Sequence, residues 1–230
     1  MIKGFIGTSL VDFPGRIASV VFVYRCNFRC PYCYNLDLVL PERYETLETI
    51  SGDWIINELK RREGFIKGLV ITGGEPTLWG DELFSFLDRV KCETGLPTKI
   101  DTNGSLPEVL KRLLESRLVD FVAIDFKTSP EKYALVGGSF KQVEKSFSIL
   151  KESSIESEVR ITCYPPLIDK ETLNEMLPYL KGFKTIALQK FVPGKTLNPE
   201  PVSPYSEEDL KSFAKFLKEN LPDAQIVERF

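Results

Sequence analysis

The sequence predicts an α/β fold, an incomplete (β/α)6 barrel whose parallel strands are each followed by a helix. Short apolar runs rich in β-branched residues alternate six times with segments whose apolar residues recur at helical spacing. Consecutive strand–helix units imply parallel strands joined by right-handed crossovers. A closed barrel of this kind has eight units, and this chain of 230 residues shows six. We therefore expect an open barrel.

Residues 17–24 form a nearly continuous apolar run with β-branched and aromatic residues, as expected for a strand covered on both faces. Six strands are predicted in all. They cover residues 17–24, 68–72, 98–102, 119–126, 158–163 and 185–191. Helices are expected over residues 47–59, 83–90, 106–114 and 140–150, and around Met176 and Phe213. Residues 1–16 are predicted to form an N-terminal hairpin or edge strand, and the proline-rich residues 193–204 an irregular loop. We expect one domain over 1–230, with the partial barrel at 17–230.

The composition is that of an ordinary globular protein and excludes several kinds of chemistry. Lys and Arg number 30 and Asp and Glu 33, so the net charge of −3 argues against a nucleic-acid partner. The absence of histidine excludes Ser-His-Asp triads, Cys-His pairs and His-ligated zinc. The start of the chain does not resemble a signal sequence, and no apolar run is long enough to span a membrane. We expect a cytoplasmic protein with no membrane partner.

The most specific motif is a loop of three cysteines, Cys26, Cys30 and Cys33, directly after the first predicted strand. Three thiolates on one short loop can bind three irons of a four-iron cluster and leave the fourth iron open to a ligand. The alternatives are a structural zinc site or three inert thiols. Zinc would need a fourth Cys or a His, and Cys92 and Cys163 lie far away in the sequence.

Polar residues and glycines follow the other predicted strands at the same end. In parallel α/β folds, functional residues gather at the carboxyl ends of the strands, so we expect the active site at this C-terminal rim. Residues 73–76 (Gly-Gly-Glu-Pro) can bring the backbone close to a ligand. After the cysteine loop, the strand ends carry Gly73, Gly74 and Glu75, then Asp101 and Thr102, Asp125 and Lys127, Arg160 and Thr162, and finally Phe191.

With these motifs, the sequence resembles the radical S-adenosylmethionine (SAM) superfamily. The C-x3-C-x2-C loop is the signature of that superfamily, Tyr32 is the aromatic residue expected before the last cysteine, and residues 73–76 match the next motif. Residues 8–16, 101–104 and 125–127 are similar to the activating enzymes of glycyl radical enzymes. Within that family, the resemblance is greatest to the activating proteins of anaerobic ribonucleoside-triphosphate reductase.

The resemblance implies an oxidoreductase with a [4Fe–4S] cluster, SAM and, as an open option, a monovalent cation. Such an enzyme cleaves SAM reductively to methionine and a 5′-deoxyadenosyl radical, which removes hydrogen from a glycine of a partner enzyme. The expected partner is a glycyl radical enzyme, with anaerobic ribonucleotide reductase as the first choice. The expected electron donor is an external one-electron carrier such as flavodoxin or ferredoxin.

The same resemblance implies roles for individual residues. Cys26, Cys30 and Cys33 would bind the cluster, and Gly73, Gly74 and Glu75 the amino group of SAM. Lys127 would meet the carboxylate, and Arg160 and Thr162 the carboxylate or the ribose. Backbone atoms at Tyr32 and Phe191 would meet the adenine. Asp125 could accept from the amino group or join Asp101 and Thr102 in binding the cation.

Other interpretations remain open at this stage. Asp101 could belong to a simple turn with the Asn-Gly pair that follows, and Asp125 with Lys127 could be an ordinary ion pair. Cys92 and Cys163 are expected to be small packed thiols. The chain could activate another glycyl radical enzyme such as pyruvate formate-lyase, or catalyse a small-molecule radical reaction. It could also be a non-enzymatic iron–sulfur protein.

Overall fold

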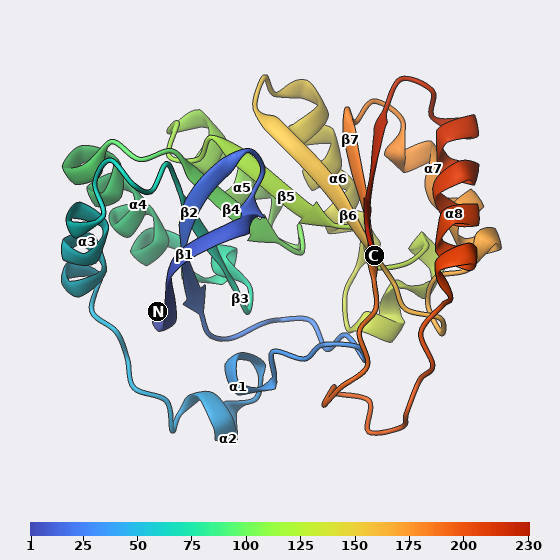
Figure 1. Ribbon diagram of the computed structural model, residues 1–230, viewed down its shortest axis with the longest axis horizontal. Coiled ribbons are helices and arrows are strands. Elements are labelled where there is room, and N and C mark those ends of the chain that lie inside the picture. Colours follow the sequence, from blue (N-terminus) through green and yellow to red (C-terminus); the bar gives the residue numbers. More distant parts are fainter. The chain divides into compact units, whose positions relative to one another are not determined.

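The computed structural model describes residues 1–230, and the chain forms two compact units (Figure 1). The first unit comprises Met1–Asn27, Asn35–Thr102 and Leu106–Val122. The second unit comprises Phe28–Tyr34, Asn103–Ser105 and Ala123–Phe230. The expectation of a single domain remains a prediction.

Strands and helices alternate along most of the chain. The strands are β1 (Ile2–Phe13), β2 (Arg16–Val23), β3 (Leu69–Gly73), β4 (Thr98–Thr102), β5 (Phe121–Asp125), β6 (Glu156–Cys163), β7 (Thr185–Lys190) and β8 (Gln225–Arg229). The α-helices are α1 (Leu36–Val39), α2 (Pro41–Tyr44), α3 (Gly52–Arg61), α4 (Gly80–Thr94), α5 (Pro107–Glu115), α6 (Phe140–Glu152), α7 (Lys170–Leu180) and α8 (Glu207–Asn220). Two 3-10 helices, η1 (Pro76–Trp79) and η2 (Pro130–Val136), follow β3 and β5.

In the first unit, β1 pairs antiparallel with β2, and β2, β3 and β4 are parallel. Val21 lies opposite Ile71, which lies opposite Ile100, and all three side chains are fully buried. Helices α3 and α4 lie together beside these strands (Figure 1). Because β2, β3 and β4 run in the same direction, the cysteine loop, residues 73–75 and Thr102 all lie toward the carboxyl ends of neighbouring strands.

In the second unit, β6, β7 and β8 are parallel, and helices α7 and α8 lie on the same side of them (Figure 1). An aromatic cluster holds β5 to the helix that follows it. The ring of Phe126, just past β5, stacks on Phe140 at 5.5 Å and meets Phe147 edge-on at 5.0 Å. This cluster fixes where the chain leaves β5, and therefore the position of Lys127.

The predicted fold class is confirmed. The sheet has eight strands in chain order, with β1 and β8 at its two ends, so it is not closed. The six predicted strands correspond to β2 to β7, and Ile2–Phe13 forms the expected edge strand β1. Residues 193–204 contain no helix or strand, as predicted.

Three details differ from the predictions. The strand β8 was not predicted, because its five residues include only two apolar side chains. Helix α3 begins at Gly52 rather than Leu47, since the Ser51 hydroxyl accepts from the N–H of Trp54 and caps the helix there. Cys92, on α4, is exposed rather than packed as predicted, whereas Cys163 is buried as predicted.

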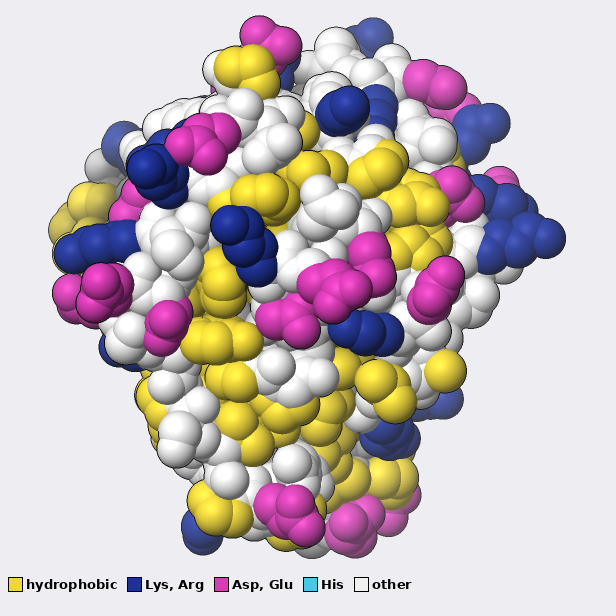
Figure 2. Space-filling model, turned by 90° about the vertical axis from the view of Figure 1, so that its right-hand side faces the viewer, with side chains coloured by type: hydrophobic (Ala, Val, Ile, Leu, Met, Phe, Trp, Pro, Cys, Tyr) yellow, Lys and Arg dark blue, Asp and Glu magenta, His cyan; other side chains and the backbone are white.

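The surface carries charges of both signs. On the face shown in Figure 2, cationic and anionic side chains are interspersed rather than gathered by sign. No helix combines the length and the apolar character that a membrane-spanning segment needs.

Candidate functional site

The cysteine loop follows β2 directly, and its last part folds as a tight turn. The N–H of Cys33 donates to the carbonyl of Cys30 at 3.0 Å. Cys30 is buried, whereas Cys26 and Cys33 are half-buried. Burial raises the pKa of the Cys30 thiol, and the nearby charge of Lys127 lowers it in part. Without a metal this thiol is therefore protonated at neutral pH, and a metal would have to displace the proton.

Residues 193–204, which we call the strap, are hydrogen-bonded to the cysteine loop. The N–H of Leu197 donates to the carbonyl of Cys33 at 3.1 Å, and the N–H of Asn198 donates to the carbonyl of Pro31 at 2.8 Å. The side-chain amide of Asn198 also donates to the hydroxyl of Tyr164 at 3.1 Å. These contacts attach an otherwise irregular loop to the backbone on both sides of Tyr32.

A cluster of three aromatic rings, tilted or edge-on to one another, supports the part of the cysteine loop that belongs to the second unit. The ring of Tyr164 lies 5.3 Å from that of Tyr32 and 4.8 Å from that of Phe191. All three side chains are buried. Burial raises the pKa of Tyr32 well above its usual value, so its hydroxyl stays neutral. The two predicted adenine neighbours, Tyr32 and Phe191, are thus linked through Tyr164, which the sequence analysis did not single out.

The glycine pair after β3 brings two backbone segments into direct contact. A Cβ on Gly74 would lie 2.0 Å from the carbonyl oxygen of Arg25, and one on Gly73 would lie 2.5 Å from that of Val23. The N–H of Gly74 donates to Val23 at 2.8 Å, and the N–H of Glu75 donates to Arg25 at 2.7 Å. Only glycine at position 74 allows this approach.

The carboxylate of Glu75 is 1% exposed and accepts several hydrogen bonds. Its Oε1 accepts from the hydroxyls of Thr77 at 2.5 Å and Thr102 at 2.7 Å, and from the N–H of Thr77 at 3.1 Å. This network fixes the Glu75 carboxylate relative to β4. It also gives Thr102 a role that does not require a cation.

Asp101 is paired within its own strand. Its carboxylate accepts from the ammonium group of Lys99, and both side chains are buried. A cation at Asp101 would therefore compete with a lysine that is already in place. The sequence analysis missed Lys99, although a period of two along a strand places residues 99 and 101 on the same face.

Asp125 lies between two cations at the carboxyl end of β5. Its Oδ1 accepts from Nε of Arg160 at 2.8 Å, and its Oδ2 accepts from Nζ of Lys127 at 3.1 Å. Burial alone would raise the pKa of Asp125, but the charges of Arg160 and Lys127 outweigh it and lower the pKa from 3.8 to about 2. Asp125 and Lys127 thus form the ion pair that the sequence left open as an alternative. Arg160 extends this pair to a triad of two cations and one anion, which carries a net positive charge.

The structure thus gathers the predicted residues into two groups. In the first unit, Gly73, Gly74 and Glu75 are joined to Thr102, and Asp101 pairs with its own strand neighbour. The second unit holds the larger group. It comprises Cys30, Tyr32, Cys33, Asp125, Lys127, Arg160, Thr162 and Phe191. Cys26 belongs to the first unit.

Comparison with known proteins identifies the family. The sequence model of the radical SAM superfamily matches residues 20–178. The chain belongs to the radical SAM superfamily. This membership implies a [4Fe–4S] cluster and SAM, as the cysteine loop suggested.

Two curated proteins are similar over most of the chain. A Methanocaldococcus jannaschii protein, provisionally named a glycyl-radical enzyme activating enzyme, is 33% identical over 98% of this chain and 95% of its own length. The pyruvate formate-lyase-activating enzyme of Streptococcus mutans is 29% identical over 81% of this chain and 74% of its own.

The fold is also found in solved structures. The crystal structure of SuiB from Streptococcus suis bound to SAM superposes with a TM-score of 0.71 over 91% of this chain, at 15% identity. This chain spans about half of that protein, 49% of its length. At this level of identity, the likeness supports the fold alone.

The donor set fits the cluster that this superfamily implies. Three thiols lie on one loop, no histidine is available, and a four-iron cluster takes one thiolate on each of three irons. No group of three or more Cys, Asp or Glu side chains is arranged to hold a single metal ion.

We predict that Gly74→Ala destabilises the protein by roughly 3 kcal/mol or more, because a methyl group at this position overlaps a backbone carbonyl that cannot move freely. Urea unfolding followed by circular dichroism measures the change. Gly194→Ala is the matched control, since no atom lies within 4 Å of its Cβ position. Equal stability of the two variants would contradict the close approach described here.

We predict that Asp125→Asn removes a pH-dependent part of the stability. The folded-state pKa of about 2 lies below the ordinary 3.8, so the folded state binds fewer protons in acid than the unfolded state. The stabilisation, roughly 2 kcal/mol, is present above about pH 4 and is lost as the pH falls toward 2. Urea unfolding between pH 5 and pH 2 should therefore show a smaller pH dependence in this variant. The control Asp88→Asn, on the exposed face of α4, should show the same pH dependence of unfolding as the wild type.

We predict that Asn198→Ala loosens the strap. The variant loses the hydrogen bond to Tyr164, so local opening becomes more frequent and trypsin cleaves after the exposed Lys195 several-fold faster. Mass spectrometry of the fragments over time measures the rate. Asn220→Ala, which loses a hydrogen bond at the end of α8, is the control. An unchanged rate in Asn198→Ala would show that its side chain does not hold the strap.

Proposed function

We propose that this protein is a radical SAM activating enzyme of a glycyl radical enzyme. One electron reduces the sulfonium of SAM, and the S–C5′ bond breaks to give methionine and a 5′-deoxyadenosyl radical. That radical takes a hydrogen atom from a glycine Cα of the partner, which leaves 5′-deoxyadenosine and a glycyl radical. The observation that carries the proposal is the similarity to the Methanocaldococcus jannaschii activating enzyme, which extends over nearly the whole of both chains.

Cys26, Cys30 and Cys33 are proposed to hold the cluster. When bound, the cluster supplies the electron for the cleavage of SAM and an open iron for its amino and carboxylate groups. The protein's own contribution is to keep the cysteine loop in one conformation. The turn from Cys30 to Cys33, the strap and the contact between the rings of Tyr164 and Tyr32 support this role.

Gly73 and Gly74, through their backbone, and Glu75, through its carboxylate, are proposed to bind the amino group of SAM. A negatively charged, buried carboxylate that is already oriented by two threonines is well suited to an ammonium group. Asp101 and Thr102 remain candidates for a monovalent cation. The pairing of Asp101 with Lys99 weighs against that role.

Residues at the carboxyl ends of β5 and β6 are proposed to bind other parts of SAM. Lys127 would bind the methionine carboxylate. Asp125 holds the lysine in place through its ion pair, and Arg160 offsets the negative charge of Asp125. The net positive triad favours an anion at this position. Arg160 or Thr162 would meet the carboxylate or the ribose, and the backbone at Tyr32 and Phe191 the adenine. A cation bound by Asp125 is disfavoured by the two positive groups beside it.

We propose anaerobic ribonucleoside-triphosphate reductase as the partner and a flavodoxin or ferredoxin as the electron donor. The resemblance of the whole chain to the activating proteins of that reductase supports this partner. Pyruvate formate-lyase is the second candidate, favoured by the similarity to the activating enzyme of Streptococcus mutans. Electron paramagnetic resonance distinguishes the two. The true partner acquires a stable glycyl radical signal when mixed with the reduced enzyme and SAM, and the other does not.

We predict that Cys30→Ala abolishes both the visible absorbance of the reconstituted cluster and the formation of 5′-deoxyadenosine from SAM, because one of three iron ligands is lost. Anaerobic reconstitution, dithionite reduction and chromatography of the products measure both effects. Cys92→Ala removes an exposed thiol on α4 and should retain both. A wild-type protein that binds a cluster but forms no 5′-deoxyadenosine would instead be a non-enzymatic iron–sulfur protein.

A further inference from the structure

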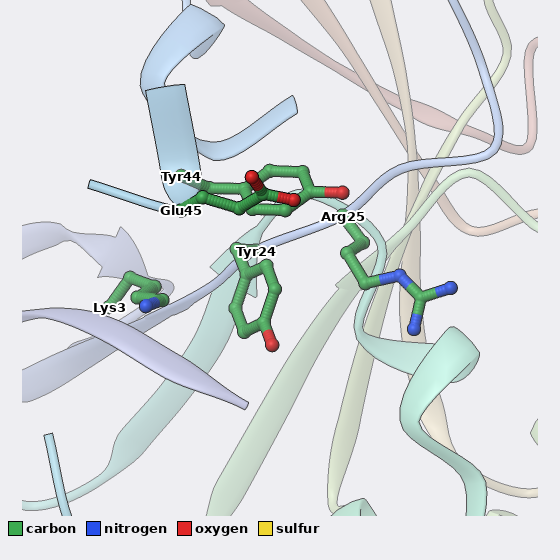
Figure 3. Close-up of a pocket in the computed structure, with 5 residues that line it drawn as sticks. All are labelled: Lys3, Tyr24, Arg25, Tyr44 and Glu45. Carbon is green, nitrogen blue, oxygen red and sulfur yellow. The ribbon is translucent and has the colours of Figure 1, made fainter. Parts of the chain in front are cut away.

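A cavity of about 410 Å³ opens in the first unit where the chain leaves β2 (Figure 3). It is lined by Lys3, Tyr24, Arg25, Tyr44 and Glu45. None of these residues has a role in binding the cluster or SAM in the proposed function. The cavity nevertheless begins one residue before Cys26, the first predicted cluster ligand.

Arg25 is held in an unusual backbone conformation. Its φ angle is +70°, and Arg117 is the only other residue besides glycines with a positive φ. Its N–H donates to Leu38 at 2.7 Å, its carbonyl accepts from Glu75 at 2.7 Å, and Gly74 leaves space for that carbonyl. A conformation that costs free energy and is fixed by several contacts is typical of functional sites. This backbone conformation places the Arg25 side chain along the cavity (Figure 3).

The cavity carries positive charge that the protein does not neutralise. The Arg25 guanidinium lies 5.7 Å from the ring of Trp79 and has no carboxylate partner. Nζ of Lys3 lies 5.0 Å from the ring of Tyr24 and donates to the carbonyl of Leu47 and the hydroxyl of Thr49.

Glu45 is the one acidic residue in the lining, and it pairs with neither cation. Figure 3 shows the guanidinium directed away from Tyr44 and Glu45. Two cations and one anion leave the lining with a net charge of +1, which favours an anionic ligand.

Two aromatic rings form the apolar part of the cavity. The ring centroids of Tyr24 and Tyr44 lie 4.8 Å apart, and the ring of Trp79 lies 4.7 Å from that of Tyr24 while its Nε1–H donates to the carbonyl of Tyr24. The rings therefore have a fixed orientation. A surface with fixed tyrosines and an arginine is typical of sites that bind a peptide side chain.

We propose that this cavity binds an acidic side chain, glutamate or aspartate, in the segment of the partner protein that carries the reactive glycine. This inference rests on the proposed function for the identity of the partner. Arg25 and Lys3 bind the carboxylate, and the tyrosines pack against the aliphatic part of the segment. Because Arg25 adjoins Cys26, an acidic residue bound here places its neighbours in the sequence close to the cysteine loop.

The test measures binding of short fluorescein-labelled peptides to the full-length protein reconstituted with its cluster. Each peptide has a central glycine flanked by alanines, and a single glutamate occupies each other position in turn. Matched peptides carry glutamine or lysine in its place. Fluorescence anisotropy should show tighter binding of one glutamate peptide than of its glutamine and lysine counterparts, and the preference should weaken with added salt.

The variants test which residues carry the preference. Arg25→Gln and, separately, Lys3→Gln should weaken binding of the glutamate peptide about fivefold, with little change in the affinity for SAM. Arg25→Glu should reverse the preference toward the lysine peptide, which a merely structural role would not produce. Lys67→Gln is the matched control, since this exposed lysine lies before β3, at the opposite end of the strand from Gly73.

The outcomes separate this inference from the proposed function. Equal binding of the three peptides would overturn the acidic-residue site. So would a loss of affinity for the glutamate peptide in Lys67→Gln that equals the loss in Arg25→Gln. A loss of SAM affinity in Arg25→Gln with unchanged peptide binding would also overturn it and assign the cavity to SAM. If the glutamate preference and its reversal are found but no glycyl radical forms on any partner, the site stands and the proposed function fails. Circular dichroism confirms that each variant is folded.

Discussion

The contact on which most of the candidate site depends is the close approach of two backbone segments, residues 23–25 and residues 73–75. It continues the pairing of β2 with β3 by two further hydrogen bonds beyond the last residues of the strands. The approach is possible because position 74 has no side chain. It sets the start of the cysteine loop, the position of the Glu75 carboxylate and the conformation of Arg25 together, so these three features cannot vary independently.

The second unit is organised by charge and aromatic packing. Asp125, Lys127 and Arg160 come from two neighbouring elements, and each cation offsets part of the cost of burying the carboxylate between them. The same lysine lies 5.9 Å from the ring of Tyr32, and its charge offsets part of the rise that burial causes in the pKa of Cys30. One cation therefore acts on a carboxylate, an aromatic ring and a cysteine of the second unit.

Features that depend on neighbouring residues could be predicted from the sequence, whereas contacts between residues distant in the sequence could not. Buried strands such as β2 were predicted because both of their faces are covered and the whole run is apolar. The half-buried edge strand β8 carries too little of that signal. The pair of Asp125 and Lys127 follows from a period of two, but Arg160 lies 35 positions away, and no local pattern indicates it.

The strap shows the same limit. Its irregular conformation could be predicted from its prolines, but its attachment to the carbonyls of Pro31 and Cys33 is made by backbone N–H groups, which every residue except proline has. Residue identity therefore carries no information about that contact. The exposed position of Cys92 was also missed, because helical spacing identifies the buried face of α4 only approximately.

The residues that recognise a partner are expected to differ in kind from those that bind SAM. Every member of a superfamily with one cofactor must bind the same atoms of that cofactor, so the cysteine loop and the Gly-Gly-Glu segment cannot distinguish one partner from another. Discrimination requires groups that touch the partner and are not occupied by the cofactor. In our proposal Arg25 and Lys3 are such groups, because Arg25 directly precedes Cys26, Lys3 lines the same cavity as Arg25, and neither has an acidic partner in the protein. Their positive charge would attract an acidic segment and repel a basic one, and repulsion of this kind contributes to specificity as much as attraction does.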